Sequence, residues 1–292
     1  LSKFTIFLFT HSKHYRTIYF FLYIYNKKII NMENNDLQII AKNKVKNYLN
    51  IKPEDLDLPI YRFTTFEQFL DILNTNELTL VKPIKWEDPY ENYILKCNYK
   101  NKNNENINVS NLMDQIFAQC WTFCSESDAL WRIYSKDSKG IRLQTTVRKL
   151  LDTIFDDTDM KSILTSFIGK VKYLTIENIE KYLSDKETIN NLFLNGSTNE
   201  FRCKSLLIKR KEFEHEMEIR LLYLVDSDSI DIHYNSKKFC INPNNLIERV
   251  LLDPRMPNDY QNVITSTSKQ LCYNNPITKS ELYKFNPINL II

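Results

Sequence analysis

Two glutamates two residues apart, Glu216 and Glu218, are the first residues whose type and spacing could support chemistry. From Met217 onward apolar side chains recur at every second position, which predicts a strand with both carboxylates on one face. Arg220 extends that face. The alternative is that the three charged residues form a solvated ion-pair ladder on an exposed face of a sheet, and such pairs stabilise a fold only slightly.

An arginine between aromatic residues, in the segment Tyr61–Thr64, is the second candidate. The guanidinium of Arg62 is a planar donor of paired hydrogen bonds, the kind of group that binds oxyanions. The structural alternative is that Arg62 pairs with an acid such as Asp88 or Glu91. These two acids lie in Trp86–Glu91, where Asp88 before a proline predicts a turn, and both are candidates for the wall of a pocket.

The segment Cys120–Leu143 predicts an apolar strand, a polar turn that contains Ser125, and a helical turn. Trp131 and Tyr134 are three residues apart on that helical turn, so they share a face and form either core or pocket wall. Gly140 then starts the next strand.

The chain has only three glycines, Gly140, Gly169 and Gly196. A dinucleotide-binding fingerprint needs three glycines within six positions, and a P-loop needs two beside a Lys-Ser/Thr pair, so both motifs are excluded. A nucleotide, if one binds, must be held without a glycine-rich loop.

The sequence favours no metal site. Its six cysteines are scattered without a Cys-x-x-Cys pair, which is typical of reduced core thiols in a cytoplasmic protein. His215 lies among glutamates, but the His-Glu-x-x-His spacing of zinc enzymes is missing.

Charge is divided unevenly along the 292 residues. The formal net charge is +3, but residues 1–31 contain five basic and no acidic residues, so the remainder carries −2. We therefore expect no footprint for duplex nucleic acid. The apolar runs in residues 1–31 are shorter than the ~20 residues that span a bilayer, so we expect no membrane partner. We interpret residues 1–31 as a non-native or disordered extension ahead of Met32.

Segments with the alternating apolar pattern of strands and segments with the apolar spacing of helices follow one another along the chain. Strands are predicted at 60–63, 77–81, 120–124, 141–145, 171–174, 216–225, 238–241 and 247–252, and helices at 34–49, 66–73, 112–118, 129–135, 147–155, 160–167, 176–183, 188–194 and 200–210. This order favours an α+β fold with a central, mostly antiparallel, split sheet over a doubly wound sheet. We divide the chain into the extension 1–31, a peripheral helix and linker at 32–57, and one domain at 58–292, with insertions near 98–110 and 145–200.

Four motifs, in this order, resemble the domain of unknown function 2971 family, and the similarity covers about residues 60–255. They are Tyr61–Thr64 before a helix, Leu78–Glu91, Cys124-Ser125 with Leu130-Trp131-x-x-Tyr134 and Lys139-Gly140, and Lys209 with Glu216-x-Glu-x-Arg220. Leu130 departs from the pattern, since the family often has Met there, and this exchange conserves volume.

A more distant similarity is to the ADP-ribosyltransferase fold, which holds NAD without a glycine-rich loop. This resemblance implies that Arg62 binds a phosphate or ribose of NAD, that Thr64 adds a hydroxyl contact, and that Tyr61 or Tyr134 stacks on nicotinamide. Ser125 would support the site from the end of its strand.

The same resemblance implies roles for the two glutamates. Glu218 would hydrogen-bond a ribose hydroxyl and stabilise the oxocarbenium-like state as nicotinamide leaves, and Glu216 would act as a base on the acceptor. We therefore expect an NAD-dependent ADP-ribosyltransferase-like or NAD-cleaving enzyme, with NAD as substrate and a macromolecular acceptor. The resemblance to the domain of unknown function 2971 family implies a role in anti-phage defence. The alternatives are a non-catalytic sensor of a nucleotide or phage component, and an interaction protein without a small ligand.

Overall fold

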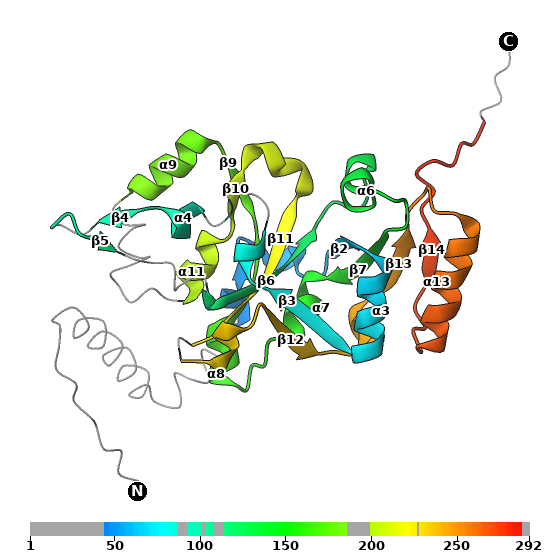
Figure 1. Ribbon diagram of the computed structural model, residues 1–292, viewed down its shortest axis with the longest axis horizontal. Coiled ribbons are helices and arrows are strands. Elements are labelled where there is room, and N and C mark those ends of the chain that lie inside the picture. Colours follow the sequence, from blue (N-terminus) through cyan, green and yellow to red (C-terminus); the bar gives the residue numbers. More distant parts are fainter. Residues whose placement is uncertain are drawn as a thin grey trace, which may run out of the picture.

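The computed structural model describes residues 44–86, 91, 93–100, 103–107, 114–185, 199–226 and 228–287, and one large sheet runs through them (Figure 1). Its strands are β1 (Tyr48–Leu49), β2 (Pro59–Thr64), β3 (Glu77–Val81), β6 (Ile116–Thr122), β7 (Ile141–Thr146), β8 (Ser166–Lys170), β11 (Glu218–Leu224), β12 (Ser236–Cys240), β13 (Arg249–Leu252) and β14 (Ile277–Lys279). The strand order is β1-β8-β11-β6-β2-β7-β13-β14, and β3 pairs with both β6 and β12.

Most neighbours in this sheet are antiparallel. Within it, β1 with β8 and β13 with β14 are the parallel pairs among the described strands. The α+β class and the mostly antiparallel sheet are therefore confirmed.

The sheet is split beside β6. This strand pairs with β11 along seven residues, but it meets β2 at a single register pair, Tyr61 opposite Thr122, and β3 at another, Val81 opposite Ala118. Between these two points a side-chain contact takes the place of backbone pairing. Gln119 Nε2 donates a hydrogen bond to the carbonyl oxygen of Thr79 at 2.9 Å. The split leaves room for a cleft between β2, β3 and β6.

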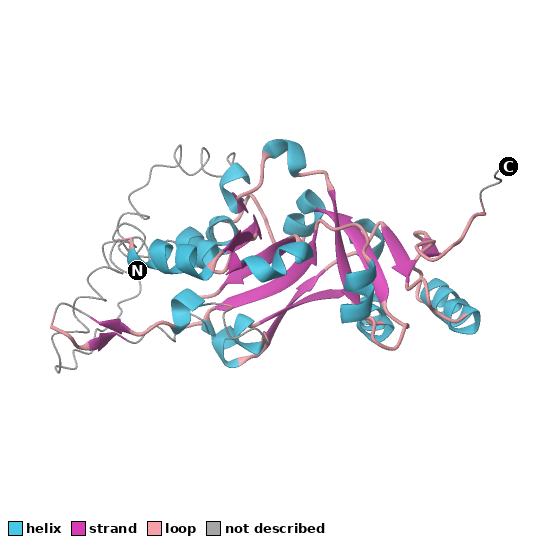
Figure 2. Cartoon of the chain, turned by 90° about the horizontal axis from the view of Figure 1, so that it is seen from above, coloured by secondary structure: helices cyan, strands magenta, loops and turns pink. Residues whose placement is uncertain are grey.

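Helices and two small strand pairs surround the sheet. The α-helices are α3 (Phe66–Thr75), α4 (Tyr93–Lys96), α6 (Asp128–Tyr134), α7 (Val147–Asp152), α8 (Met160–Thr165), α9 (Ile176–Ser184), α11 (Asn199–Ser205), α12 (Pro243–Leu246) and α13 (Asn258–Gln270). The 3-10 helices are η1 (Lys44–Asn47), η2 (Pro53–Asp55), η3 (Pro83–Lys85), η4 (Lys211–Glu216) and η5 (Ile230–His233). The pair β4 (Tyr99–Lys100) and β5 (Asn106–Ile107) lies at the end of the molecule opposite α13 (Figures 1 and 2), and β9 (Lys172–Leu174) pairs with β10 (Ile208–Arg210).

Both faces of the central strand β11 are covered. Ile219 and Leu221 belong to one apolar cluster, whereas Leu222 and Leu224 belong to another. Because side chains alternate along a strand, the two clusters lie on opposite faces of the sheet. The face that carries Glu218 is therefore enclosed, and the predicted solvated ladder is wrong.

Several predicted elements have different bounds. The helix predicted at 112–118 is replaced by β6 from Ile116, because this short apolar run gains a buried pairing with β11. The helix predicted at 200–210 ends at Ser205 and gives way to β10. Helix α13 was missed, since its sequence is largely polar and only Ile264 and Ser268 are buried.

Two predicted helices lie wholly or partly outside the described residues. The helix at 188–194 falls there, as does the part of the 34–49 helix before residue 44. The end of the latter is not α-helical, because η1 leads into β1, which pairs with β8. The cap of α3 is confirmed: the Thr65 side chain accepts a hydrogen bond from the backbone N–H of Gln68 at 3.3 Å.

Gly140 closes a tight turn after α6. Its N–H donates to Ser135 Oγ at 2.8 Å, and a Cβ at this position would lie 2.5 Å from Ser135 Cβ and 3.3 Å from its Cα. We predict that Gly140→Ala lowers the free energy of unfolding by about 1–3 kcal/mol, because the backbone at residue 140 must move away from Ser135 to make room for the methyl group. Urea denaturation tests this, with the exposed Lys136→Ala as control, and equal stability of the two variants would contradict it.

Candidate functional site

A cleft of about 540 Å³ opens over the split in the sheet. Residues of β2, α3, β3, β6, α6 and η4 line it, together with Trp86 and the first residue of β11. A cavity of this volume is large enough for a small molecule such as a nucleotide.

Arg62 reaches into this cleft from β2. Its Nη1 lies 3.4 Å from the carbonyl oxygen of Cys120, and no carboxylate of the described residues pairs with it. Burial lowers the pKa of Arg62, while nearby Cys120 and Tyr134 oppose that change. A largely enclosed cation without a counter-ion is a binding position for an anion.

The predicted alternative for Arg62, a pair with Glu91, is wrong. The Glu91 carboxylate lies 3.0 Å from Lys209 Nζ and 3.2 Å from Arg220 Nη2, so its charge is already balanced by those two residues. Asp88 lies outside the described residues.

Glu218 and Arg220 form a buried ion pair beside the cleft. Arg220 donates from Nε to one carboxylate oxygen at 3.0 Å and from Nη2 to the other at 2.8 Å. Its Nη1 donates to the carbonyl oxygen of Leu206 at 2.6 Å, and its guanidinium stacks 4.3 Å from the ring centroid of Trp86. Arg220 is fully buried and Glu218 is 5% exposed, so the pair is fixed in both position and charge.

Lys209 of β10 joins Glu216 and Glu91 to this pair. Its ammonium lies 2.6 Å from Glu216 and 3.4 Å from Glu218, in addition to its contact with Glu91. We call Glu91, Lys209, Glu216, Glu218 and Arg220 the charge cluster. It unites residues of two of the motifs that carry the family resemblance, although they lie more than 100 positions apart in the sequence.

The protonation states in the charge cluster follow from these contacts. Burial alone would raise the pKa of Glu218, but the charge and hydrogen bonds of Arg220 and the charge of Lys209 outweigh it and lower the pKa to about 2. Burial would lower the pKa of Lys209 and of Arg220, yet the charge of Glu218 raises both. All three groups are therefore ionised at neutral pH. Burial, and then the charge of Glu218, raise the pKa of the neighbouring Cys120 thiol, which stays protonated.

Aromatic side chains form another wall of the cleft. Tyr134 of α6, which is 47% exposed, stacks on Phe63 with 6.1 Å between ring centroids. The guanidinium of Arg142 lies over the ring of Tyr61, 4.3 Å from the ring centroid. These rings offer flat apolar surfaces for a planar ligand group.

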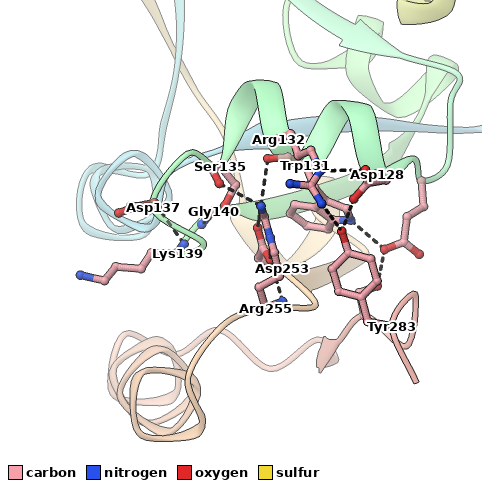
Figure 3. A network of polar contacts seen from close by, with 12 residues as sticks. Asp128, Trp131, Arg132, Ser135, Asp137, Lys139, Gly140, Asp253, Arg255 and Tyr283 are labelled. Atoms are coloured by element: carbon pink, nitrogen blue, oxygen red, sulfur yellow. Dashed lines mark hydrogen bonds and ion pairs between the residues drawn. The ribbon is translucent and has the colours of Figure 1, made fainter. Parts of the chain in front are cut away.

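A polar network holds α6, and with it Tyr134, in place (Figure 3). Arg255 pairs with Asp253 at 2.7 Å and donates to the carbonyl oxygens of Trp131 at 3.2 Å and Ser135 at 2.9 Å, which caps the C-terminal end of the helix. Trp131 itself is fully buried, and its Nε1 donates to Glu126 at 2.8 Å. Trp131 is thus a core residue behind the cleft and not part of its lining.

The sequence-predicted residues are partly brought together. Five of them line the cleft, namely Tyr61, Arg62, Tyr134, Glu216 and Glu218. Thr64 is buried and bonds to Gln68, which does line the cleft. Ser125 is exposed and lies outside the lining, because β6 ends three residues earlier at Thr122, whose side chain lines the cleft instead.

Sequence reasoning missed Trp86, Gln119, Cys120 and Lys209 as site residues. Trp86 and Lys209 do occur in the motifs of the resemblance, and that was the available signal. Glu216 was predicted on the strand, but it ends η4, and Met217 adopts a left-handed conformation with φ 44° before β11 begins.

The described residues contain no group of histidine, cysteine and acidic side chains arranged to hold a metal ion. In the same part of the chain, no helix combines the length and apolar character that crossing a membrane requires.

Residues 130–221 match the family model described as a protein of unknown function, DUF2971. The predicted resemblance to that family is thus confirmed over these residues, which contain α6 from Leu130 onward and the Glu-x-Glu-x-Arg segment. Among curated proteins, none matches the sequence.

Solved structures of DarT from Thermus sp. 2.9 are similar to this chain at low level. The complex with carba-NAD+ shares 16% identity and a TM-score of 0.35, covering 80% of this chain and 100% of the other. The complex with NAD+ shares 15% identity and a TM-score of 0.37, covering 80% of this chain and 100% of the other. The complex with ADP-ribosylated ssDNA shares 14% identity and a TM-score of 0.37, covering 81% of this chain and 100% of the other. We draw no function from a likeness at this level.

Removing one member of the buried ion pair should destabilise the fold. Arg220→Met leaves the carboxylates of Glu218 and Glu91 short of a cation, so we predict a loss of about 3–5 kcal/mol in the free energy of unfolding. The control is Arg148→Met, which breaks an exposed pair with Asp57 and should cost under about 1 kcal/mol. Similar losses in both variants, measured by urea denaturation, would contradict the prediction.

Glu218 should also make stability depend on acid. Its pKa is lower in the folded chain than its ordinary value of 4.5, so its contribution is complete above about pH 4.5 and is lost as pH falls toward 2. We predict that wild-type protein loses about 3 kcal/mol over this range through Glu218, and that Glu218→Gln loses less. The free energy of unfolding, measured in urea at several pH values, tests this; parallel pH curves for the two proteins would refute it.

Proposed function

We propose that the protein is an NAD-using enzyme of the ADP-ribosyltransferase type, which transfers ADP-ribose to a macromolecular acceptor or to water. One observation carries the proposal: Arg62, a cation with no counter-ion among the described residues, and the carboxylates of Glu216 and Glu218 line the same cleft, on opposite sides of the split in the sheet. Such a cleft suits a ligand that is anionic at one end and becomes cationic at the other.

The anionic end would be the pyrophosphate of NAD. Arg62 can donate two parallel hydrogen bonds to a phosphate, which requires no glycine-rich loop. The aromatic rings of Tyr61 and Tyr134 would receive the nicotinamide or adenine ring.

The cationic end would be the ribose attached to nicotinamide. In the reaction the bond between ribose C1′ and the nicotinamide nitrogen breaks, and its electron pair goes to the ring, which leaves as neutral nicotinamide. The acceptor O–H or N–H, or a water molecule, then forms the new bond to C1′ and releases a proton. A carboxylate on the acidic side of the cleft would stabilise the ribosyl cation and take up that proton before it passes to solvent.

A second candidate, a non-catalytic nucleotide sensor, is favoured by one observation. Both oxygens of Glu218 are already bound by Arg220, so this carboxylate is well placed as a structural group. The identity of the acceptor, the role in anti-phage defence and the cytoplasmic location all stay predictions.

Arg62 provides the direct test. We predict that Arg62→Ala weakens NAD+ binding at least ~10-fold, because it removes a charge-assisted contact to phosphate, and that Arg62→Lys recovers only part of it. Arg148→Ala is the matched control, since this arginine forms an exposed pair with Asp57. Calorimetry with NAD+ gives the affinity, and nicotinamide release is measured with water, protein and single-stranded nucleic acid as acceptors.

The outcomes separate the candidates. Nicotinamide release by wild type that is lost in Arg62→Ala supports the enzyme. Binding of NAD+ without release under any acceptor condition supports the sensor. If wild type neither binds nor cleaves NAD+, the proposed function is wrong.

A further inference from the structure

The two glutamates of the cleft differ in how many of their oxygens are free. Glu218 has both oxygens bound, one by Arg220 Nε at 3.0 Å and the other by Arg220 Nη2 at 2.8 Å, with Lys209 at 3.4 Å from the latter. Glu216 has only Oε2 bound, by Lys209 at 2.6 Å, and no described residue bonds to its Oε1. A carboxylate that must contact a ligand needs a free oxygen, and Glu216 has one.

The positions of the two side chains agree with this difference. The Glu216 side chain is 15% exposed, about twice the 7% of Glu218, and it lines the cleft from the end of η4. The left-handed residue Met217 turns the chain between them. Thr122 donates from Oγ1 to the Glu216 carbonyl oxygen at 2.5 Å, so the backbone of Glu216 is fixed to β6.

The balance of charge also points to Glu216. The charge cluster holds three carboxylates and two cations, so one negative charge is left over. Arg220 is already engaged by Glu218, Glu91 and the carbonyl oxygen of Leu206. The least enclosed acid, Glu216, shares its one cation with two other carboxylates and can therefore present that charge to the cleft.

We propose that Glu216, through Oε1, is the carboxylate that contacts the ligand in the cleft, that Lys209 is its positioning residue, and that Glu218 with Arg220 supports them without contacting the ligand. This assignment rests on the proposed function, and it reverses the weight that the resemblance gives to Glu218. Glu216 then stabilises the ribosyl cation and accepts the proton of the acceptor.

Activity measurements test the assignment first. We expect Glu216→Gln to lower kcat for nicotinamide release at least ~100-fold with a small change in KM, since it removes a charge needed in the transition state. Glu214→Gln, an exposed neighbour in the same 3-10 helix, is the matched control. Glu218→Gln should keep kcat within ~10-fold of wild type when assayed below its unfolding temperature. Loss of activity in Glu218→Gln but not in Glu216→Gln would overturn the proposal.

Lys209 is tested by rescue. Lys209→Met should lower kcat because Glu216 loses its orienting partner, and Lys209→Arg should restore part of it, since the charge is kept. The exposed neighbour Lys211→Met is the control. Equal kcat in Lys209→Met and Lys209→Arg, with both variants folded by circular dichroism, would remove the positioning role.

A measurement without NAD keeps the assignment testable if the proposed function fails. Carboxyl labelling with a water-soluble carbodiimide and an amine, read by mass spectrometry, reports which carboxylate is free. We expect Glu216 to be labelled at least ~10-fold faster than Glu218, and addition of ADP-ribose to slow labelling of Glu216 alone. Faster labelling of Glu218 would overturn the assignment even if NAD+ is the wrong ligand, whereas absence of nicotinamide release with the expected labelling pattern would reject only the proposed function.

Discussion

The candidate site depends on the burial of one guanidinium, that of Arg220. A fully buried charge is tolerated only when carboxylates and carbonyl oxygens surround it, and here Glu218, Glu91 and Leu206 do so, with Trp86 covering its flat face. These partners come from three separate parts of the chain, Trp86–Glu91, Leu206 and Glu218. Their convergence fixes where β10 and η4 lie against β11, and through them where the cleft has its charged wall.

The sequence predicted those features that local patterns determine. Alternation after Met217 gave the faces of β11, and the threonine before Phe66 gave the start of α3. Patterns were less decisive where tertiary contacts choose between structures. The run at Ile116–Ala118 fits a helix or a strand, and only its pairing with β11 selects the strand. Helix α13 buries few of its side chains. Its sequence therefore shows no clear helical spacing of apolar residues.

The site was predictable to a similar degree. Arg62 and the two glutamates were found because their residue types limit their roles, and Tyr61 and Tyr134 followed from their neighbours. Burial of the glutamates was not predictable, because Lys209, which pairs with both of them, and Glu91, which pairs with Lys209 and Arg220, are distant in sequence or were assigned elsewhere. Ser125 was misplaced because β6 ends at Thr122, two residues before the predicted end of the strand.

The single register pairs on either side of the split have a mechanical consequence. β2 and β3 hold β6 at Thr122 and Ala118 only, so the half of the sheet with β11 and the half with β7 are joined by few backbone hydrogen bonds near the cleft. A molecule that touches Arg62 on one half and Glu216 on the other would tie the two halves together. Occupancy would therefore stiffen the whole sheet, and strands that never meet the ligand would share in its binding free energy.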